Sequence, residues 1–285
     1  MQLPPYWQVT PLAVVAVVAG IGYEIGLRRL AHRQGPERRR AARRHSWAFY
    51  GGLGVLVAVV SGPLDRWAMA WLSVHMILHV LEMFYLPPLL IVGAPWVPLV
   101  FALPVDRRRA LLRFYYRSPW AAGLRGLWAG VTNPVVAVIL FNAVMVFWHV
   151  PRVFDWAANR DWVMTWLMAP SFIVVGLLFW RIILPSHPWA PRGSTRVQIG
   201  AIVVTAFEML VLAMSMSIFT KAPWYSMNVL MDGPAAALRD QRYAAGILWI
   251  CGDFWAVPAL VLVGYRLHGR GGGVSASLER VLDRV

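Results

Sequence analysis

Seven runs of apolar residues, each long enough to cross a lipid bilayer as a helix, constrain this chain more than any other feature of its sequence. A hydrocarbon core of about 30 Å takes roughly 20 helical residues. Because lipid offers no hydrogen-bond partners to backbone N–H and C=O groups, each run is predicted to be helical. The sequence therefore predicts an all-α polytopic membrane protein with seven transmembrane helices. The runs lie near residues 6–27, 47–67, 72–93, 133–152, 161–184, 197–220 and 243–266.

Composition excludes several other classes of protein. Hydrophobic residues make up 59% of the chain and charged residues only 14%, whereas soluble domains usually carry about a quarter charged residues. The single cysteine, Cys251, excludes an internal disulfide framework and a multi-cysteine metal site. The sequence contains neither a P-loop nor a G-x-S-x-G motif. We therefore expect a membrane protein that is not an enzyme.

The distribution of basic residues predicts the orientation. Of the 27 Lys and Arg residues, 21 lie in alternate connecting segments or near the C-terminus, and 6 lie elsewhere. Basic loops face the cytoplasm, so residues 28–46 and 104–132 are predicted inner loops, with the N-terminus outside and the C-terminus inside. The net charge of +14 then reflects topology and contact with anionic lipid, not nucleic-acid binding. We expect one membrane-embedded domain over residues 1–285, with a flexible basic tail at 267–285.

Imidazole and thioether side chains gather at one predicted depth, near the outer ends of the helical runs. His75 and His79 are four residues apart and share a helix face, and His149 falls at a similar depth on the next run. Both kinds of side chain are ligands that a soft monovalent copper ion accepts. The sequence therefore predicts an outer copper-binding layer. Its candidate ligands are His75, His79, His149, Met76, Met164, Met168, Met214 and Met216.

Carboxylates inside the predicted spans form a second group of candidates. An ionised group at the bilayer centre costs about 2.5–3.5 kcal/mol, so such residues face the bundle interior. Glu82 follows His79 by three residues and could orient its imidazole or bind a metal itself. Glu208 and Asp253 fall at matching depths. They could share a proton, hold helices together through hydrogen bonds, or belong to a proton relay.

Several sequence motifs are similar to those of one known family. A histidine pair is followed by two prolines, an asparagine begins the fourth run, and an Asp-Gln pair precedes the last; these residues are His75, His79, Pro87, Pro88, Asn133, Asp240 and Gln241. Together they resemble the CtaG family, the multispan cytochrome c oxidase assembly factors of Gram-positive and related bacteria. The fifth run departs from the family pattern, because Met168-Ala169 stands where relatives usually carry a Glu-His pair.

The resemblance implies a multi-pass protein of the bacterial plasma membrane that assists the assembly of haem-copper cytochrome c oxidase. The implied partners are oxidase subunits, an extracytoplasmic copper chaperone and membrane lipid. The residues leave four mechanisms open: copper relay through the His/Met layer, a redox role with haem held by His79 and His149, proton transport through the acids, and a metal-free assembly scaffold.

Overall fold

The computed structural model describes residues 9–32, 34–226 and 233–270, apart from the side chains of 251–253, 269 and 270. Within these residues the fold is helical, and no strand occurs. The elements are α1 (Pro11–Ala31), α2 (Pro36–Ser61), α3 (Pro63–Ala68), α4 (Leu72–Val80), the π-helical turn η1 (Leu81–Tyr85), α5 (Leu86–Gly93), α6 (Trp96–Ala102), α7 (Val105–Arg117), α8 (Pro119–Val131), α9 (Pro134–His149), α10 (Pro151–Ala158), α11 (Asp161–Val163), the π-helical turn η2 (Met164–Met168), α12 (Ala169–Ile183), α13 (Thr195–Ser217) and α15 (Pro234–Arg270).

Proline and a capping side chain begin several of these helices. Thr10 precedes α1, and its hydroxyl accepts a hydrogen bond from the Ala13 N–H at 3.2 Å. Asn133 does the same for α9, accepting from the Val135 N–H at 3.0 Å. In both helices a proline follows at the first helical position, where its missing N–H costs nothing. The Asn133 motif residue therefore begins a helix.

The number of spans differs from the expectation of seven. Within the described residues, five segments are long and apolar enough to cross a membrane: Pro11–Ala31, Leu72–Gly93, Asp161–Ile183, Thr195–Ser217 and Pro234–His268. A sixth arises if α8 and α9, bent by 75° where they meet, count as one span. The second predicted run lies in α2, a 26-residue helix whose arginine-rich first half leaves too short an apolar stretch. The orientation stays a prediction.

The predicted basic loops are largely helical. The segment 28–46 contains the end of α1 and the first turns of α2, and the segment 104–132 forms α7 and α8. Charged side chains do not prevent helix formation, since Arg is a good helix former. The predicted tail at 267–285 lies mostly outside the described residues; its first residues continue α15.

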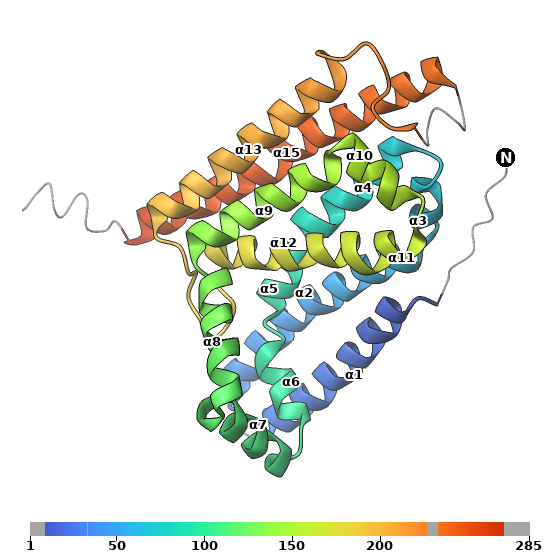
Figure 1. Cartoon of the computed structure of the whole chain (residues 1–285). Helices are drawn as coiled ribbons and strands as arrows, with labels where there is room; N and C mark the ends of the chain where they lie inside the picture. Colours follow the sequence, from blue (N-terminus) through green and yellow to red (C-terminus); the bar gives the residue numbers. More distant parts are fainter. Residues whose placement is uncertain (1–8, 33, 227–232, 271–285) are drawn as a thin grey trace, which may run out of the picture.

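The third run is interrupted by a π-helical turn and by a break after Gly93. The helix continues past Pro87 and Pro88 only by passing through η1, because a proline removes one backbone hydrogen bond and crowds the preceding turn. It ends at Gly93, and Ala94 adopts a left-handed conformation with φ of 45°. The following helix α6 then turns away from α5 (Figure 1).

The segment α4–η1–α5 lies at the centre of the bundle. It contacts α2, α12 and α15, while α13 packs on α15, and α9 packs on α12 and α13 (Figure 1). Glycine permits the closest approach: a Cβ on Gly176 would lie 2.6 Å from Pro87 Cγ. The central position brings the His75 face of α4 against helices from the second half of the chain.

Candidate functional site

Three imidazoles from two helices meet in the buried core. His75 and His79 come from α4 and His149 ends α9; their exposed fractions are 4%, 5% and 3%. The ring centroids of His75 and His79 are 4.3 Å apart, and those of His79 and His149 are 5.8 Å apart. The structure thus places the three predicted histidines in one continuous cluster inside the bundle.

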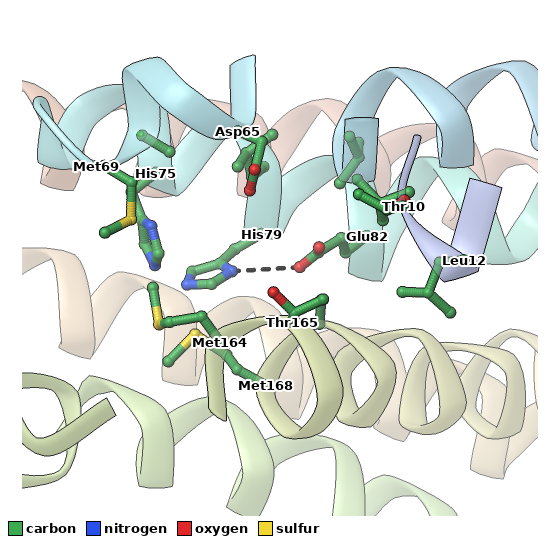
Figure 2. Close-up of a pocket in the computed structure, with 15 residues that line it drawn as sticks. Thr10, Leu12, Asp65, Met69, His75, His79, Glu82, Met164, Thr165 and Met168 are labelled. Atoms are coloured by element: carbon green, nitrogen blue, oxygen red, sulfur yellow. Dashed lines mark hydrogen bonds and ion pairs between the residues drawn. The ribbon is translucent and has the colours of Figure 1, made fainter. Parts of the chain in front are cut away.

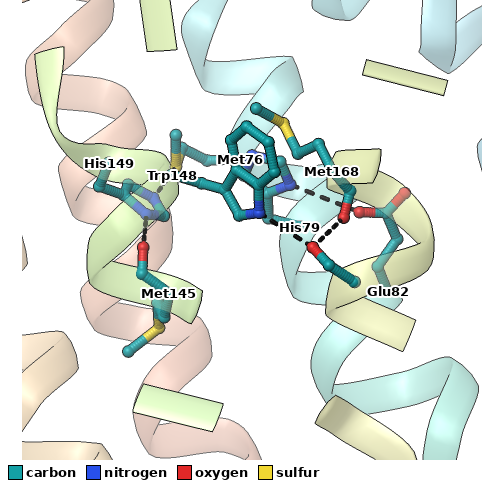
Figure 3. A network of polar contacts seen from close by, with 8 residues as sticks. Met76, His79, Glu82, Met145, Trp148, His149 and Met168 are labelled. Carbon is teal, nitrogen blue, oxygen red and sulfur yellow. Dashed lines mark hydrogen bonds and ion pairs between the residues drawn. The ribbon is translucent and has the colours of Figure 1, made fainter. Parts of the chain in front are cut away.

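His149 is held by hydrogen bonding within its own helix. Its Nδ1 lies 2.6 Å from the carbonyl oxygen of Met145, and its Nε2 lies 3.4 Å from the sulfur of Met76 (Figure 3). A carbonyl only accepts hydrogen bonds, so Nδ1 carries the proton. In the neutral ring, Nε2 then presents a lone pair to a thioether that also has only lone pairs to offer.

His79 is oriented by a carboxylate. Its Nδ1 lies 3.4 Å from Glu82 Oε2, and both side chains are buried (Figure 3). Glu82 belongs to η1, the π-helical turn that accommodates the two prolines. When Nδ1 donates to the carboxylate, the opposite nitrogen, Nε2, is left as an electron-pair donor. Glu82 is therefore placed as the support for His79 that its sequence spacing predicts.

His75, a member of the cluster, also lines a small pocket. Its Nε2 is buried and makes no hydrogen bond. The cavity has a volume of about 120 Å³. Thioethers gather at the end of this pocket where His75 lies (Figure 2). Its lining includes Asp65, Met69, His75, His79, Glu82, Met164 and Met168.

Aromatic rings and one hydroxyl hold the cluster in place. Phe154 packs edge-on against His75 with centroids 5.1 Å apart, and Phe172 packs against His79 at 4.4 Å. The indole of Trp148 donates to Ser171 Oγ at 2.9 Å, and that hydroxyl donates to the Met168 carbonyl at 2.7 Å. These contacts pack aromatic rings against the imidazoles and tie α9 to η2 and α12.

The Asp-Gln motif holds the cluster from outside. Asp240, near the start of α15, accepts hydrogen bonds from the first backbone N–H groups of α4, those of Leu72 and Ser73. Gln241 accepts from the Trp224 N–H at 2.7 Å and donates to the Met216 carbonyl at 2.8 Å. Both side chains therefore position backbone groups. The Leu72 N–H, which donates to Asp240, lies three residues before His75.

Other predicted residues lie elsewhere in the bundle. Met214 and Met216 share the predicted depth, but they are on α13 and do not line the pocket; Met216 is buried in the core where α13 meets α15. Both carboxylate oxygens of Glu208 are buried without a hydrogen-bond partner, also on α13 and away from the pocket. The Asp253 side chain lies outside the described residues.

The donor set is mixed. Among the residues described, no three side chains of the His, Cys, Asp and Glu types are placed to hold a metal ion together. The sulfur of Met76 instead stands beside an imidazole. Asp65 and Met69 line the pocket, although the sequence did not identify them as candidates. They lie in and just after α3, separated from α4 by a turn, so helical spacing could not relate them to His75.

Comparison with known proteins gives one family. Residues 21–269 match the family described as cytochrome c oxidase caa3 assembly factor. Uncharacterized proteins of Mycobacterium bovis and Mycobacterium tuberculosis are each 28% identical over 261 residues, or 88% of this chain. One of Mycobacterium leprae is 25% identical over 265 residues, again 88% of the chain. The chain spans 37% of the length of these relatives. No solved structure matches it.

Proposed function

The chain belongs to the cytochrome c oxidase caa3 assembly factor family, and from that premise we propose that it carries Cu(I) to a haem-copper oxidase during assembly. The proposal places it in the bacterial plasma membrane, with oxidase subunits as acceptors and an extracytoplasmic copper chaperone as donor. Copper is cargo in this scheme, taken up and given away. The observation that carries the proposal is the pairing of His149 Nε2 with Met76 Sδ.

The distance between these two atoms suits a shared metal ion. A d¹⁰ ion binds imidazole nitrogen at about 2.0 Å and sulfur at about 2.3 Å, so a tetrahedral angle separates the two donors by about 3.5 Å. The observed separation is 3.4 Å. Two lone pairs facing each other in an apolar core gain nothing from their proximity, and a second proton on His149 would bury a costly charge. A soft cation between them removes both difficulties.

The surrounding donors suit release as well as binding. Thioether and imidazole are ligands that Cu(I) accepts, whereas carboxylates suit harder ions. His79, with centroid 5.8 Å from that of His149, supplies the next nitrogen, and Glu82 keeps its ring oriented. A site built from neutral donors of this kind holds the ion without trapping it. The chain of rings from His75 to His149 then provides successive ligands for one ion.

The size of the cavity favours an ion over haem. Pockets that hold drug-sized ligands have volumes of about 300–1,000 Å³, while the cavity beside His75 has about 120 Å³. Phe154 and Phe172 fill the space next to the imidazoles. Purified protein is therefore expected to lack a Soret band. A metal-free scaffold would explain the aromatic packing, but it gives no reason for the facing lone pairs of His149 and Met76.

Competitive titration tests the proposal directly. The full chain, purified in detergent, is titrated with Cu(I) against a chromophoric Cu(I) chelator. His149→Ala and Met76→Leu should each lower the affinity by at least tenfold, because even residues that only support a metal ligand are worth about 10–100-fold. Met145→Leu is the matched control, since Met145 is equally buried and its side chain points away from His149 (Figure 3). Equal affinities for all four proteins would refute the site.

Cells test the delivery role. A strain that lacks the protein should assemble little active cytochrome c oxidase in ordinary medium and should recover activity when copper is supplied in excess. The His149→Ala variant should need the same supplement, whereas Met145→Leu should not. Loss of oxidase that no copper concentration restores would contradict delivery and favour a scaffold.

A further inference from the structure

The pocket beside His75 is lined by potential copper-binding side chains that do not belong to the His149–Met76 pair. Neither His149 nor Met76 lines it. Its lining comes instead from the start of α1, the end of α2, α3 and the residue after it, α4 and η1, and from η2 and the start of α12. The cavity is therefore distinct from the His149–Met76 pair, although it lies beside the same row of imidazoles.

His75, which lines this pocket, has a buried nitrogen without a hydrogen-bond partner. More than about nine in ten buried polar groups in proteins have a hydrogen-bond partner, yet His75 Nε2 has none although the residue is only 4% exposed. Its ring is packed edge-on against His79 and Phe154, so no nearby protein group can supply the partner. His75 therefore brings an imidazole with an unpaired nitrogen to the wall of the pocket.

Soft donors and one acid line the same pocket as His75. The thioethers of Met69 and Met164 reach the His75 end of the cavity from different segments (Figure 2). The π-helical turn η2 places Met164 and Met168 on the same wall. Asp65, a residue exposed at the surface, also lines the pocket and brings a carboxylate to it. A monovalent soft cation matches this combination of sulfur, nitrogen and one carboxylate.

We propose that this pocket is the loading station for Cu(I): Met69, Met164 and His75 take up the ion, and His79 passes it on to His149 and Met76. The inference rests on the proposed function. Each transfer is a ligand exchange in which a new copper–nitrogen or copper–sulfur bond forms as an existing bond from copper to a nitrogen or sulfur donor breaks. The ion stays Cu(I), the donors are lone pairs, and no electron is exchanged. Asp65 lowers the cost of bringing a positive charge to the pocket.

Uptake kinetics separate the loading station from the deeper pair. The full chain in detergent is mixed with Cu(I) held by a chromophoric chelator, and the rate of copper uptake is followed together with the equilibrium affinity. The Met69→Leu/Met164→Leu double variant should take up copper at least tenfold more slowly, while the affinity of the His149–Met76 site stays within twofold. Asp65→Asn should also slow uptake and should weaken its dependence on salt, since it removes a surface charge.

Control variants distinguish a failure of the loading station from a failure of the proposed function. Met83→Leu changes a methionine that is buried in η1 but does not line the pocket. The copper uptake rate of this variant should equal that of the wild type. His75→Asn should slow uptake as the double variant does, which provides a test even if the double variant folds poorly. Unchanged uptake rates in both would overturn the loading station. Failure of the wild type to bind Cu(I) at all would instead overturn the proposed function.

Discussion

Removing the Asp240 carboxylate should loosen the N-terminus of α4 and with it the helix that carries His75 and His79. The first N–H groups of any helix lack partners within the helix. Here the Leu72 N–H donates to Asp240 Oδ2 at 2.5 Å and the Ser73 N–H donates to Oδ1 at 3.3 Å. The Ser73 hydroxyl donates to the same carboxylate. Asp240 thus caps α4 from a helix 168 residues away in sequence.

The expected cost follows from these contacts. Loss of a capping side chain costs about 0.5–2 kcal/mol, and hydrogen bonds to charged groups lie toward the upper end of their range. We therefore expect Asp240→Ala to lower the free energy of unfolding by about 2 kcal/mol, roughly a 30-fold change in the unfolding equilibrium. Asp240→Asn keeps one acceptor oxygen and should cost about half as much.

Unfolding of the purified chain in mixed micelles of increasing denaturing detergent measures the change. Asp155→Ala is the control, because Asp155 also accepts a hydrogen bond from a backbone N–H, that of Ser226 at 2.9 Å, but at an exposed position. It should cost less than about 1 kcal/mol, since water replaces an exposed acceptor. Equal stabilities for the Asp240→Ala and Asp155→Ala variants would refute the capping argument.

Two further substitutions test the packing and the support of the cluster. Gly176→Ala should destabilise the protein by about 1–3 kcal/mol through overpacking, because the new Cβ would lie 2.6 Å from Pro87 Cγ. Gly200→Ala, where nothing lies within 4 Å of the new Cβ, should be neutral or slightly stabilising; thermal unfolding of the two variants compares them, and equal melting temperatures would contradict the close approach of α12 to α5. Glu82→Gln should lower the Cu(I) affinity about 10–100-fold by removing the carboxylate that orients His79. Competitive titration measures this, and an unchanged affinity would show that Glu82 does not support a metal ligand.

The number of membrane spans illustrates one limit of sequence reasoning. Apolar runs marked where helices lie, but α2 begins well before its apolar part, and the fourth run is a 16-residue helix, α9, bent away from α8. Arginine is as compatible with a helix as leucine is. Hydropathy therefore located the apolar stretches without giving the true ends of these helices.

The methionines illustrate a second limit. Depth along a helix is readable from sequence because each residue rises about 1.5 Å, and on that measure Met164, Met168, Met214 and Met216 were equivalent. The structure puts the first two on the wall of the His75 pocket and leaves the last two on α13, outside it. Lateral position depends on which helices pack together, which depth does not report.

Local chemistry in the chain was sufficient to determine helical secondary structure, the break after Gly93, the shared face of His75 and His79, and the motifs of the family, because each depends on neighbours within a few residues. Tertiary structure alone decided that His149 Nε2 faces Met76 Sδ, that His75 lines a pocket, and that Asp240 caps α4. These contacts join segments about 70 to 170 residues apart, and only the packing of helices on one another brings such segments within bonding distance.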